Sequence, residues 1–460
     1  MPTALTRLRG QVERWWARWR PSCWPRRARR TAGTIALIAL LLGFVVTGYR
    51  AVRPADNFSP ALAPLPSPVE ALPLSYAELA SAPLIVEGRL RVYAAADHVW
   101  ADAPVTANRQ MTPYWTVRRW PAEVVGVVAV ERQFLWGGGA LVIAKWSDGL
   151  VTALDTTGRI TWQVRVTPDP AETYTGRRTG ARTTYRPEGL FLATSAADGR
   201  PILVVAGLDQ VHAYDPYTGT ERWSKVFTGP SGCYRTDWTG QTTYVVKDSC
   251  VQPASLAVYD AASGTPLSQW RPPGASAGPG REANWYVQPV ACDLGMSRCQ
   301  LFQAAAVADV ITAADAAQGE QGVVPETWSL GLDGTVVAES GVVSDAPLIV
   351  ADLRIEQMFN GYVWARSRST GELAWVSRYP GALVAVDGTS VYLVGRKLGL
   401  LVLNARTGAL MTNIDMRGGW SPGFVYVHDG FMATERIIGP ETNDDDHHYL
   451  GLTPVLLAGV

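Results

Sequence analysis

The clearest pattern in the chain is a short apolar run that enters a polar turn and then returns toward a tryptophan. Four copies read VTALDTTGRITW (151–162), VHAYDPYTGTERW (211–223), LAVYDAASGTPLSQW (256–270) and VWARSRSTGELAW (363–375). A fifth, LVLNARTGAL (401–410), lacks the tryptophan. The β-branched and aromatic residues before each turn favour a strand. The Asp, Asn, Ser, Thr and Gly residues favour a tight turn. Each copy therefore predicts two short strands joined by a turn.

The spacing of the copies indicates a repeated unit of several strands. The turn glycines 158, 219, 264, 371 and 408 are 61, 45, 107 and 37 residues apart. The largest gap has room for another unit, and ETWSLGLDGTVVAE (326–339) is a degenerate copy. A unit of about 40 residues with several short strands is typical of a β-propeller blade, which buries its faces only by stacking on its neighbours.

The sequence therefore predicts an all-β fold: a β-propeller of about seven four-stranded blades, with six or eight as alternatives, over residues 85–460. The strands FVYV and FMATER, in residues 421–460, are expected to form the last blade. LIVEGRLRVYA (84–94) or YWTVRRW (114–120) would complete it from the other end. Such closure removes the exposed sheet edge.

The repeats resemble those of quinoprotein-type propellers, the PQQ-like repeat family. That family's pattern is approximately apolar-x-Ala-x-Asp-x-x-Thr-Gly-x-x-x-Trp, and residues 151–162 and 211–223 fit it best. The resemblance implies that each repeat tryptophan docks against the next blade, as expected here for Trp162, Trp223, Trp270 and Trp375. The family includes quinone-dependent dehydrogenases and non-enzymatic envelope scaffolds, such as the outer-membrane assembly lipoprotein of Gram-negative bacteria.

The charge is distributed unevenly, although the chain has 41 basic and 41 acidic residues. Residues 1–50 contain ten arginines and one acid, Glu13, for a net charge of +9. The remaining 410 residues therefore carry 31 bases against 40 acids, a net charge of −9. An acidic body of this kind argues against a nucleic-acid partner.

The N-terminal region predicts a membrane anchor. Residues 31–49 (TAGTIALIALLLGFVVTGY) contain no charge and would span about 28 Å as a helix, one bilayer core. Nine arginines precede them, so residues 1–30, a basic and Trp-rich segment, are expected in the cytoplasm and the carboxyl side outside. This is a single-pass type II arrangement in the cell membrane. A cleaved signal peptide is the alternative.

Residues 50–84 contain seven prolines, which predicts a stiff extracytoplasmic stalk before the propeller. Four cysteines follow on the external side, where an even number favours disulfides. Three connectivities are open, and the nearest-neighbour one pairs Cys233 with Cys250 and Cys292 with Cys299.

Two polar segments are candidates for chemistry. The first, NDDDHHY (443–449), offers oxygen and imidazole ligands for a metal at Asp444, Asp445, Asp446, His447 and His448. Its spacing matches neither an EF-hand nor a His-Glu-x-x-His site, so a polar loop between blade strands is preferred. The second, GRRTGARTTYR (176–186), brings together four arginines that suit an acidic partner, with a solvated loop as the preferred alternative.

The expected function is that of a membrane-anchored scaffold that binds a protein or an envelope polymer, without a cofactor. The alternative is a PQQ- and calcium-dependent oxidoreductase, or a small-ligand binder, that uses the propeller funnel. The sequence has no adjacent Cys-Cys pair and no Cys-x-x-Cys-His motif, and no residue can be assigned as a calcium ligand or catalytic base.

Overall fold

The computed structural model contains two compact units, Met1–Ala55 and Asp56–Val460. It describes residues 34–35, 37–38, 40–41, 55–131, 139–227, 235–249, 251, 254–273, 285–293, 298–306, 326–331, 336–340, 347–358, 360–395, 399–416, 418–442 and 444–460. The predicted basic segment 1–30 and most of the predicted span 31–49 lie outside these residues. Within the described parts of the chain, no helix has the length and apolar character needed to cross a membrane.

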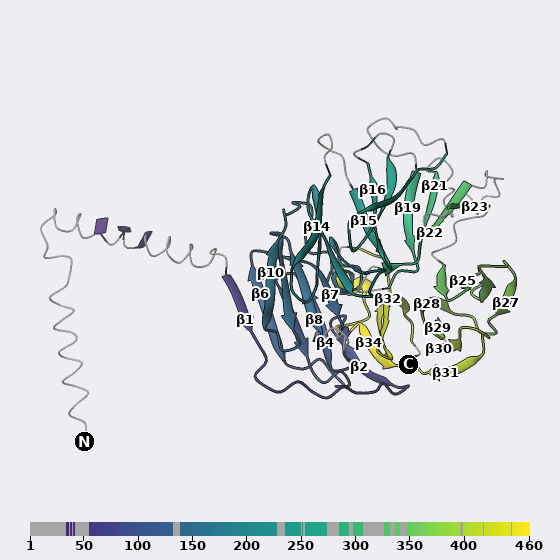
Figure 1. Cartoon of the computed structure of the whole chain (residues 1–460). Helices are drawn as coiled ribbons and strands as arrows, with labels where there is room; N and C mark the ends of the chain where they lie inside the picture. The colour runs from purple at the N-terminus through teal and green to yellow at the C-terminus, as the bar shows by residue number, and fades with distance from the viewer. Residues whose placement is uncertain are drawn as a thin grey trace, which may run out of the picture. The chain divides into compact units, whose positions relative to one another are not determined.

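The second unit is a β-propeller of eight sheets, which follow one another along the chain around a common centre (Figure 1). The first four blades, in chain order, contain β3 (Leu84–Val86), β4 (Leu90–Ala95), β5 (His98–Asp102) and β6 (Trp115–Trp120); β7 (Val124–Val130), β8 (Leu141–Trp146), β9 (Leu150–Asp155) and β10 (Ile160–Arg165); β11 (Leu190–Thr194), β12 (Pro201–Ala206), β13 (Gln210–Tyr214) and β14 (Glu221–Val226); and β15 (Arg235–Gly240), β16 (Thr243–Asp248), β17 (Ser255–Asp260) and β18 (Pro266–Trp270).

The other four contain β19 (Trp285–Val290), β21 (Leu301–Ala306), β22 (Glu326–Gly331) and β23 (Val336–Ser340); β24 (Leu348–Val350), β25 (Leu353–Gln357), β26 (Val363–Ser367) and β27 (Leu373–Val376); β28 (Ala382–Asp387), β29 (Ser390–Gly395), β30 (Gly399–Asn404) and β31 (Leu410–Ile414); and β32 (Ser421–His428), β33 (Phe431–Ile437), β34 (Val455–Gly459) and β2 (Ser75–Leu79). Two further strands extend existing sheets: β1 (Ala55–Ser59) lies beyond β6 in blade 1, and β20 (Arg298–Cys299) lies beside β15 in blade 4.

The inner strands of the blades pack against their neighbours around the centre. Contacts join β3 to β7, β7 to β11, β11 to β15, β24 to β28 and β28 to β32. The strand β7, VVGVVAV, is buried at every position. Adjacent blades cover both faces of blade 2, so this inner strand is continuously apolar and does not alternate.

The blade number differs from the predicted seven, because the sequence contains a blade that its turns do not reveal. In blade 1 the connection between β5 and β6 spans residues 103–114 and lacks the short turn, from Asp, Asn or Ser to Gly, that marks the other copies. Segments 84–94 and 114–120, expected to complete the last blade, instead belong to this separate blade.

The ring is closed by a strand from the N-terminal side of the propeller. Strand β2 pairs with the C-terminal β34 in antiparallel register, with Ser75 opposite Ala458 and Leu79 opposite Val455. Both β1 and β2 lie within residues 50–84, the range predicted to be a stalk. Prolines of this range therefore separate two strands that belong to the propeller's sheets, and β2 is the outer strand of the last blade.

The repeat tryptophans connect consecutive blades by one recurring contact. The indole N–H of Trp162 donates to the carbonyl oxygen of Pro216 in the next blade at 2.8 Å. Trp223 makes the same bond to Ala261 at 2.9 Å, and Trp375 to Ala405 at 2.8 Å. Each ring lies against the turn glycine of the blade that it contacts: Gly219, Gly264 and Gly408, respectively.

Trp270 and Trp115 vary this arrangement. Trp270 packs against Trp285 and Trp328 of the degenerate fifth blade, with ring centroids 5.9 Å apart in both pairs. Trp115, at the start of β6, is fully buried against Gly158 of blade 2. The repeat pattern does not reveal Trp115, because no turn of the repeat type precedes it. The five tryptophans lie in five different blades. Trp115 and Trp375 are buried, and the other three are half-buried.

Candidate functional site

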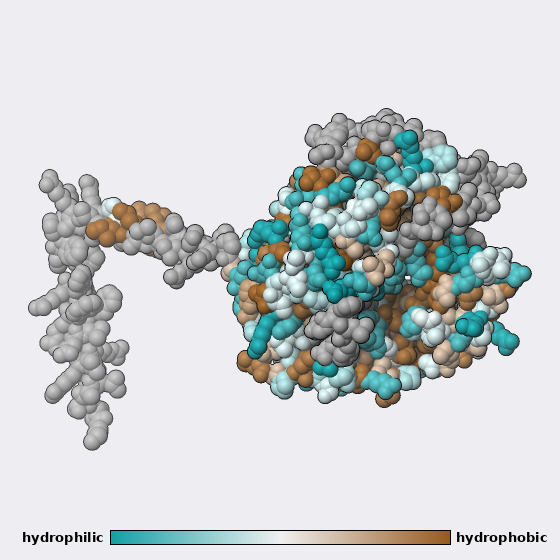
Figure 2. Space-filling view, in the orientation of Figure 1, coloured by the Kyte–Doolittle hydropathy of each residue, from teal (hydrophilic) through white to brown (hydrophobic). Residues whose placement is uncertain are grey.

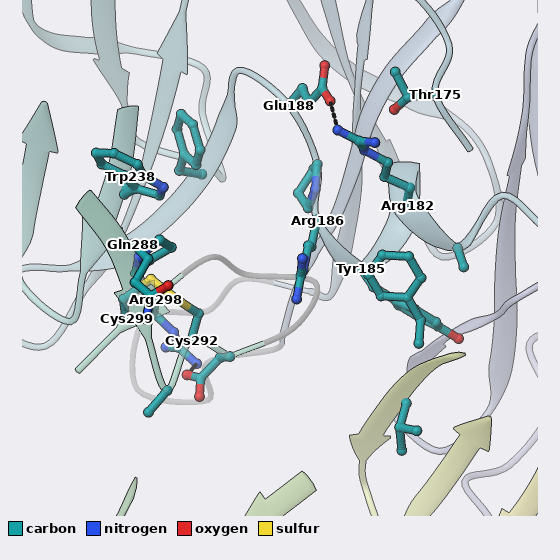
Figure 3. A pocket seen from close by; sticks show the side chains of 18 of the residues that line it. Thr175, Arg182, Tyr185, Arg186, Glu188, Trp238, Gln288, Cys292, Arg298 and Cys299 are labelled. Carbon is teal, nitrogen blue, oxygen red and sulfur yellow. Dashed lines mark ion pairs between the residues drawn. A yellow bond between two sulfur atoms is a disulfide. The ribbon is translucent and has the colours of Figure 1, made fainter. Parts of the chain in front are cut away.

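A cavity with a volume of about 1980 Å³ lies at the centre of the propeller. Residues of several blades line it, including Leu208 of blade 3, Trp238 of blade 4, Ile349 of blade 6 and Phe424 of blade 8. In Figure 3, Arg182, Tyr185 and Arg186 lie on one side of this space and Trp238 and the Cys292–Cys299 bridge on another. On the outer surface shown in Figure 2, polar and apolar residues are interspersed.

Several charged side chains in or directly behind the cavity wall form ion pairs with one another. Lys145 is fully buried, and its Nζ lies 2.6 Å from Glu172 Oε1 and 2.6 Å from the carbonyl oxygen of Ala206. Burial lowers the pKa of Lys145 and raises the pKa of Glu172, although each charge stabilises the other. This pair holds the segment after β10 against blades 2 and 3 and leaves the Lys145 ammonium inaccessible to a ligand.

Three more ion pairs lie along the wall, and they keep most of its cations engaged. Arg182 and Glu188 are 3.4 Å apart, as the dashed line in Figure 3 shows. Arg235 lies 3.7 Å from Asp237, whose pKa is raised by burial, and Arg298 lies 3.1 Å from Asp293. The guanidinium of Arg186 instead lies over the Phe424 ring, 5.2 Å from its centroid. The wall is therefore a mixed surface of paired charges and apolar side chains.

The long connection between β10 and β11 carries a short helix, α3 (Ala181–Tyr185), that packs against β4, β7 and β32. Tyr185 is fully buried in this contact. Its hydroxyl donates to the carbonyl oxygen of Pro83 at 2.9 Å, and its ring stacks on Tyr426 at 4.8 Å. The connection thus fixes Arg182 and Arg186 in the cavity wall.

The two polar segments that the sequence singled out bind each other. Arg177 Nε donates to Asp445 Oδ1 at 2.8 Å, and Arg178 Nη1 donates to Asp446 Oδ1 at 2.5 Å. The candidate ligands therefore lie in a salt-bridged loop, in which Asp444 caps the one-turn helix α5 (Asp445–His448). His447 contacts Asp444, while His448 Nδ1 faces the carbonyl oxygens of Gly439 and Pro440. Among the described residues, these five side chains do not converge on one point.

Cys292 and Cys299 are joined by a disulfide between β19 and β20. Both cysteines line the cavity. Cys233 and Cys250, the other predicted pair, lie outside the described residues.

The structure brings together a second group of side chains that the sequence did not predict. Glu131, His428 and Asp429 bring three potential ligand atoms within 4.8 Å of one another. Glu131 and His428 are almost 300 residues apart in the chain, so no local motif marks the group.

Residues 147–283, less than a third of the chain, match the protein family described as outer membrane protein assembly factor BamB. None of the curated proteins matches the chain. The eight sheets make the domain a β-propeller, and within it residues 147–283 are similar to PQQ-like repeats.

Solved structures that resemble the chain include BamB from Moraxella catarrhalis, at 15% identity and a TM-score of 0.44 over 85% of this chain and 98% of that one. The computationally designed Ika8 protein resembles it at 13% identity and a TM-score of 0.45, over 84% of this chain and 100% of the other. Dihydro-heme d1 dehydrogenase NirN resembles it at 14% identity and 0.42, over 83% and 73%. At these TM-scores the likenesses carry no argument about function.

Proposed function

We propose that the chain is a membrane-anchored extracytoplasmic propeller that acts as a protein-interaction or envelope-assembly scaffold. In this proposal residues 31–49 form the single membrane span, residues 1–30 remain in the cytoplasm, and the propeller binds its partner outside. The uncharged run and the nine arginines before it support the anchor. The match of residues 147–283 to an assembly-factor family supports the scaffold role.

The size of the cavity is the observation that carries the proposal. Pockets for small molecules have volumes of roughly 300–1,000 Å³, whereas this cavity has about 1980 Å³. Its wall combines apolar side chains with charges that are largely paired within the protein. A segment of a protein partner would fill such a space better than a single small molecule would, and it could bury the apolar part of the wall.

The proposal is tested by site-specific photocrosslinking in living cells. A benzoylphenylalanine residue replaces Leu208, which is 51% exposed and lines the cavity. The matched control places it at Leu267, which is 55% exposed on the outer strand β18 and does not line the cavity. We expect a discrete protein adduct from position 208 and none from position 267, with the partner identified by mass spectrometry.

Three results would overturn the scaffold role. The first is the absence of any protein adduct at position 208, and the second is the same set of adducts at positions 208 and 267. The third is a change in the absorption spectrum of the purified chain on addition of PQQ and Ca²⁺, accompanied by reduction of an electron-accepting dye. This third result would favour the oxidoreductase alternative.

A further inference from the structure

Polar groups from blades 8, 1 and 2 meet beside the central cavity. Glu131 follows β7 in blade 2, whereas His428 and Asp429 lie at the turn between β32 and β33 in blade 8. His428 Nε2 lies 2.6 Å from Glu131 Oε1 and 3.8 Å from Asp429 Oδ1. Both Glu131 and His428 line the cavity.

The Asp429 carboxylate is held in place by the blade between the other two. Its Oδ2 accepts a hydrogen bond of 2.9 Å from the backbone N–H of Gly88, in the β3–β4 turn of blade 1. This bond leaves Oδ1 as the atom that faces His428. One oxygen of Asp429 is thus anchored, and the other is available to a ligand.

The chemistry of these three groups is that of a site for a divalent transition metal. One imidazole nitrogen and two carboxylate oxygens are ligands that Zn²⁺ and similar ions accept. The three ligand atoms lie within 4.8 Å of one another, so small side-chain movements bring them around one ion. The Glu131 side chain is 51% exposed, the Asp429 side chain 33% and the His428 side chain 19%. Water or a ligand from a partner can therefore reach the ion.

One nearby charge opposes a cation. The guanidinium of Arg298 acts electrostatically on both Glu131 and His428. Arg298 is itself paired with Asp293 at 3.1 Å, which reduces but does not remove this repulsion. We therefore expect moderate affinity, in the micromolar range or about 10⁻⁶ M, rather than that of a closed structural zinc site.

We propose that Glu131, His428 and Asp429 form a binding site for a divalent transition-metal ion of the Zn²⁺ class. The ion joins blade 8, in which the N-terminal strand β2 closes the ring, to blade 2 across blade 1. Its remaining coordination positions face the cavity and take water or a carboxylate of a bound segment. The site does not depend on the scaffold role, because the geometry holds whatever fills the cavity.

The test measures Zn²⁺ binding to the full-length chain in detergent by isothermal titration calorimetry, after removal of bound metal with EDTA. Glu131→Gln, His428→Asn and Asp429→Asn each remove one ligand and preserve the approximate shape. Asn suits position 429, where φ is 50°, since Asn tolerates this left-handed region. We expect each variant to bind Zn²⁺ at least about tenfold more weakly, with the same apparent Tm in EDTA.

His212→Asn is the matched control. His212 Nδ1 lies 2.9 Å from one carboxylate, that of Glu221, but among the described residues the pair does not belong to a group of three potential metal ligands. This variant should leave Zn²⁺ binding unchanged. The proposal is overturned if Zn²⁺ does not bind at about 100 µM, or if the three variants bind as tightly as the wild type. It is also overturned if His212→Asn abolishes binding, or if millimolar Ca²⁺ displaces Zn²⁺, because a hard-cation site takes oxygen ligands. Glu131→Gln is the variant least able to disturb folding, because the Glu131 side chain is half exposed.

Discussion

The contact between a repeat tryptophan and the next blade's turn glycine gives a quantitative prediction for Gly264→Ala. Gly264 has φ 69°, and a Cβ at this position would lie 2.7 Å from Cδ2 of Trp223. Carbon atoms in contact are normally about 3.5–4.0 Å apart. The Trp223 ring would have to move by about 1 Å, which disturbs its 2.9 Å hydrogen bond to Ala261.

Gly371→Ala is the matched control for backbone strain. Gly371 occupies the same turn position in blade 6, with φ 74°, but among the described residues no atom lies within 4 Å of the point that an alanine Cβ would occupy. Left-handed backbone costs an alanine about 1–2 kcal/mol, part of which is offset by the lower entropy of the unfolded chain. We therefore expect Gly371→Ala to lower the free energy of unfolding by about 1 kcal/mol.

Gly264→Ala carries the same backbone cost and an additional cost for the displaced ring. Overpacking typically costs about 1–3 kcal/mol and a lost hydrogen bond about 1 kcal/mol. The additional loss is therefore about 2–4 kcal/mol. In a unit of this size 1 kcal/mol changes Tm by about 1 °C, so Gly264→Ala should melt about 2–4 °C below Gly371→Ala.

Differential scanning calorimetry at one scan rate measures this difference, and a double-mutant cycle assigns its cause. Trp223→Ala alone should cost about 3–5 kcal/mol, since it removes a large packed ring. In that background Gly264→Ala should cost only the backbone strain, about 1 kcal/mol. Equal losses for Gly264→Ala and Gly371→Ala, or an unchanged cost in the Trp223→Ala background, would refute the docking argument.

Three further predictions concern topology, cysteines and pH. Alkaline phosphatase fused after Val460 should be active if the propeller is exported, and an inactive fusion contradicts the type II arrangement. Non-reducing peptide mapping should find Cys292 linked to Cys299 and Cys233 to Cys250, whereas free thiols at all four positions would refute both bridges. Burial raises the pKa of Glu435 above 4.5, so its contribution to stability is present at low pH and is lost as pH rises through the raised value. The Tm of Glu435→Gln relative to wild type should therefore increase with pH, and a pH-independent difference contradicts this.

Local features of the chain predicted the repeated elements correctly, because they depend on neighbouring residues. The turn residues after Leu154 and Tyr214 bind their own backbone: Asp155 Oδ1 accepts from Thr157 N at 2.8 Å, and Asp215 Oδ1 from Tyr217 N at 3.0 Å. A glycine at positive φ completes each turn. These are short-range bonds, so the sequence shows them directly.

The blade number and the ring closure depend on pairing between distant segments, which local patterns cannot specify. Strand β2 is short and follows several prolines, and only its register with β34 makes it part of the last blade. The first blade has a long connection in place of the repeat's turn, so its sheet is recognised only from its pairing.

Ion pairs between residues that are distant in the sequence could likewise be identified only from the tertiary structure. The arginines 177 and 178 and the acids 445 and 446 each looked like a separate candidate site, but folding places them in contact and each neutralises the other. Conversely, Glu131 and His428 carry no signal in their own segments, and only the closed ring brings them together. The sequence by itself determined the strands and turns of the repeat copies and the docking of Trp162, Trp223 and Trp375. The closing of eight blades into one ring decided which distant charges meet, because that geometry belongs to the whole chain.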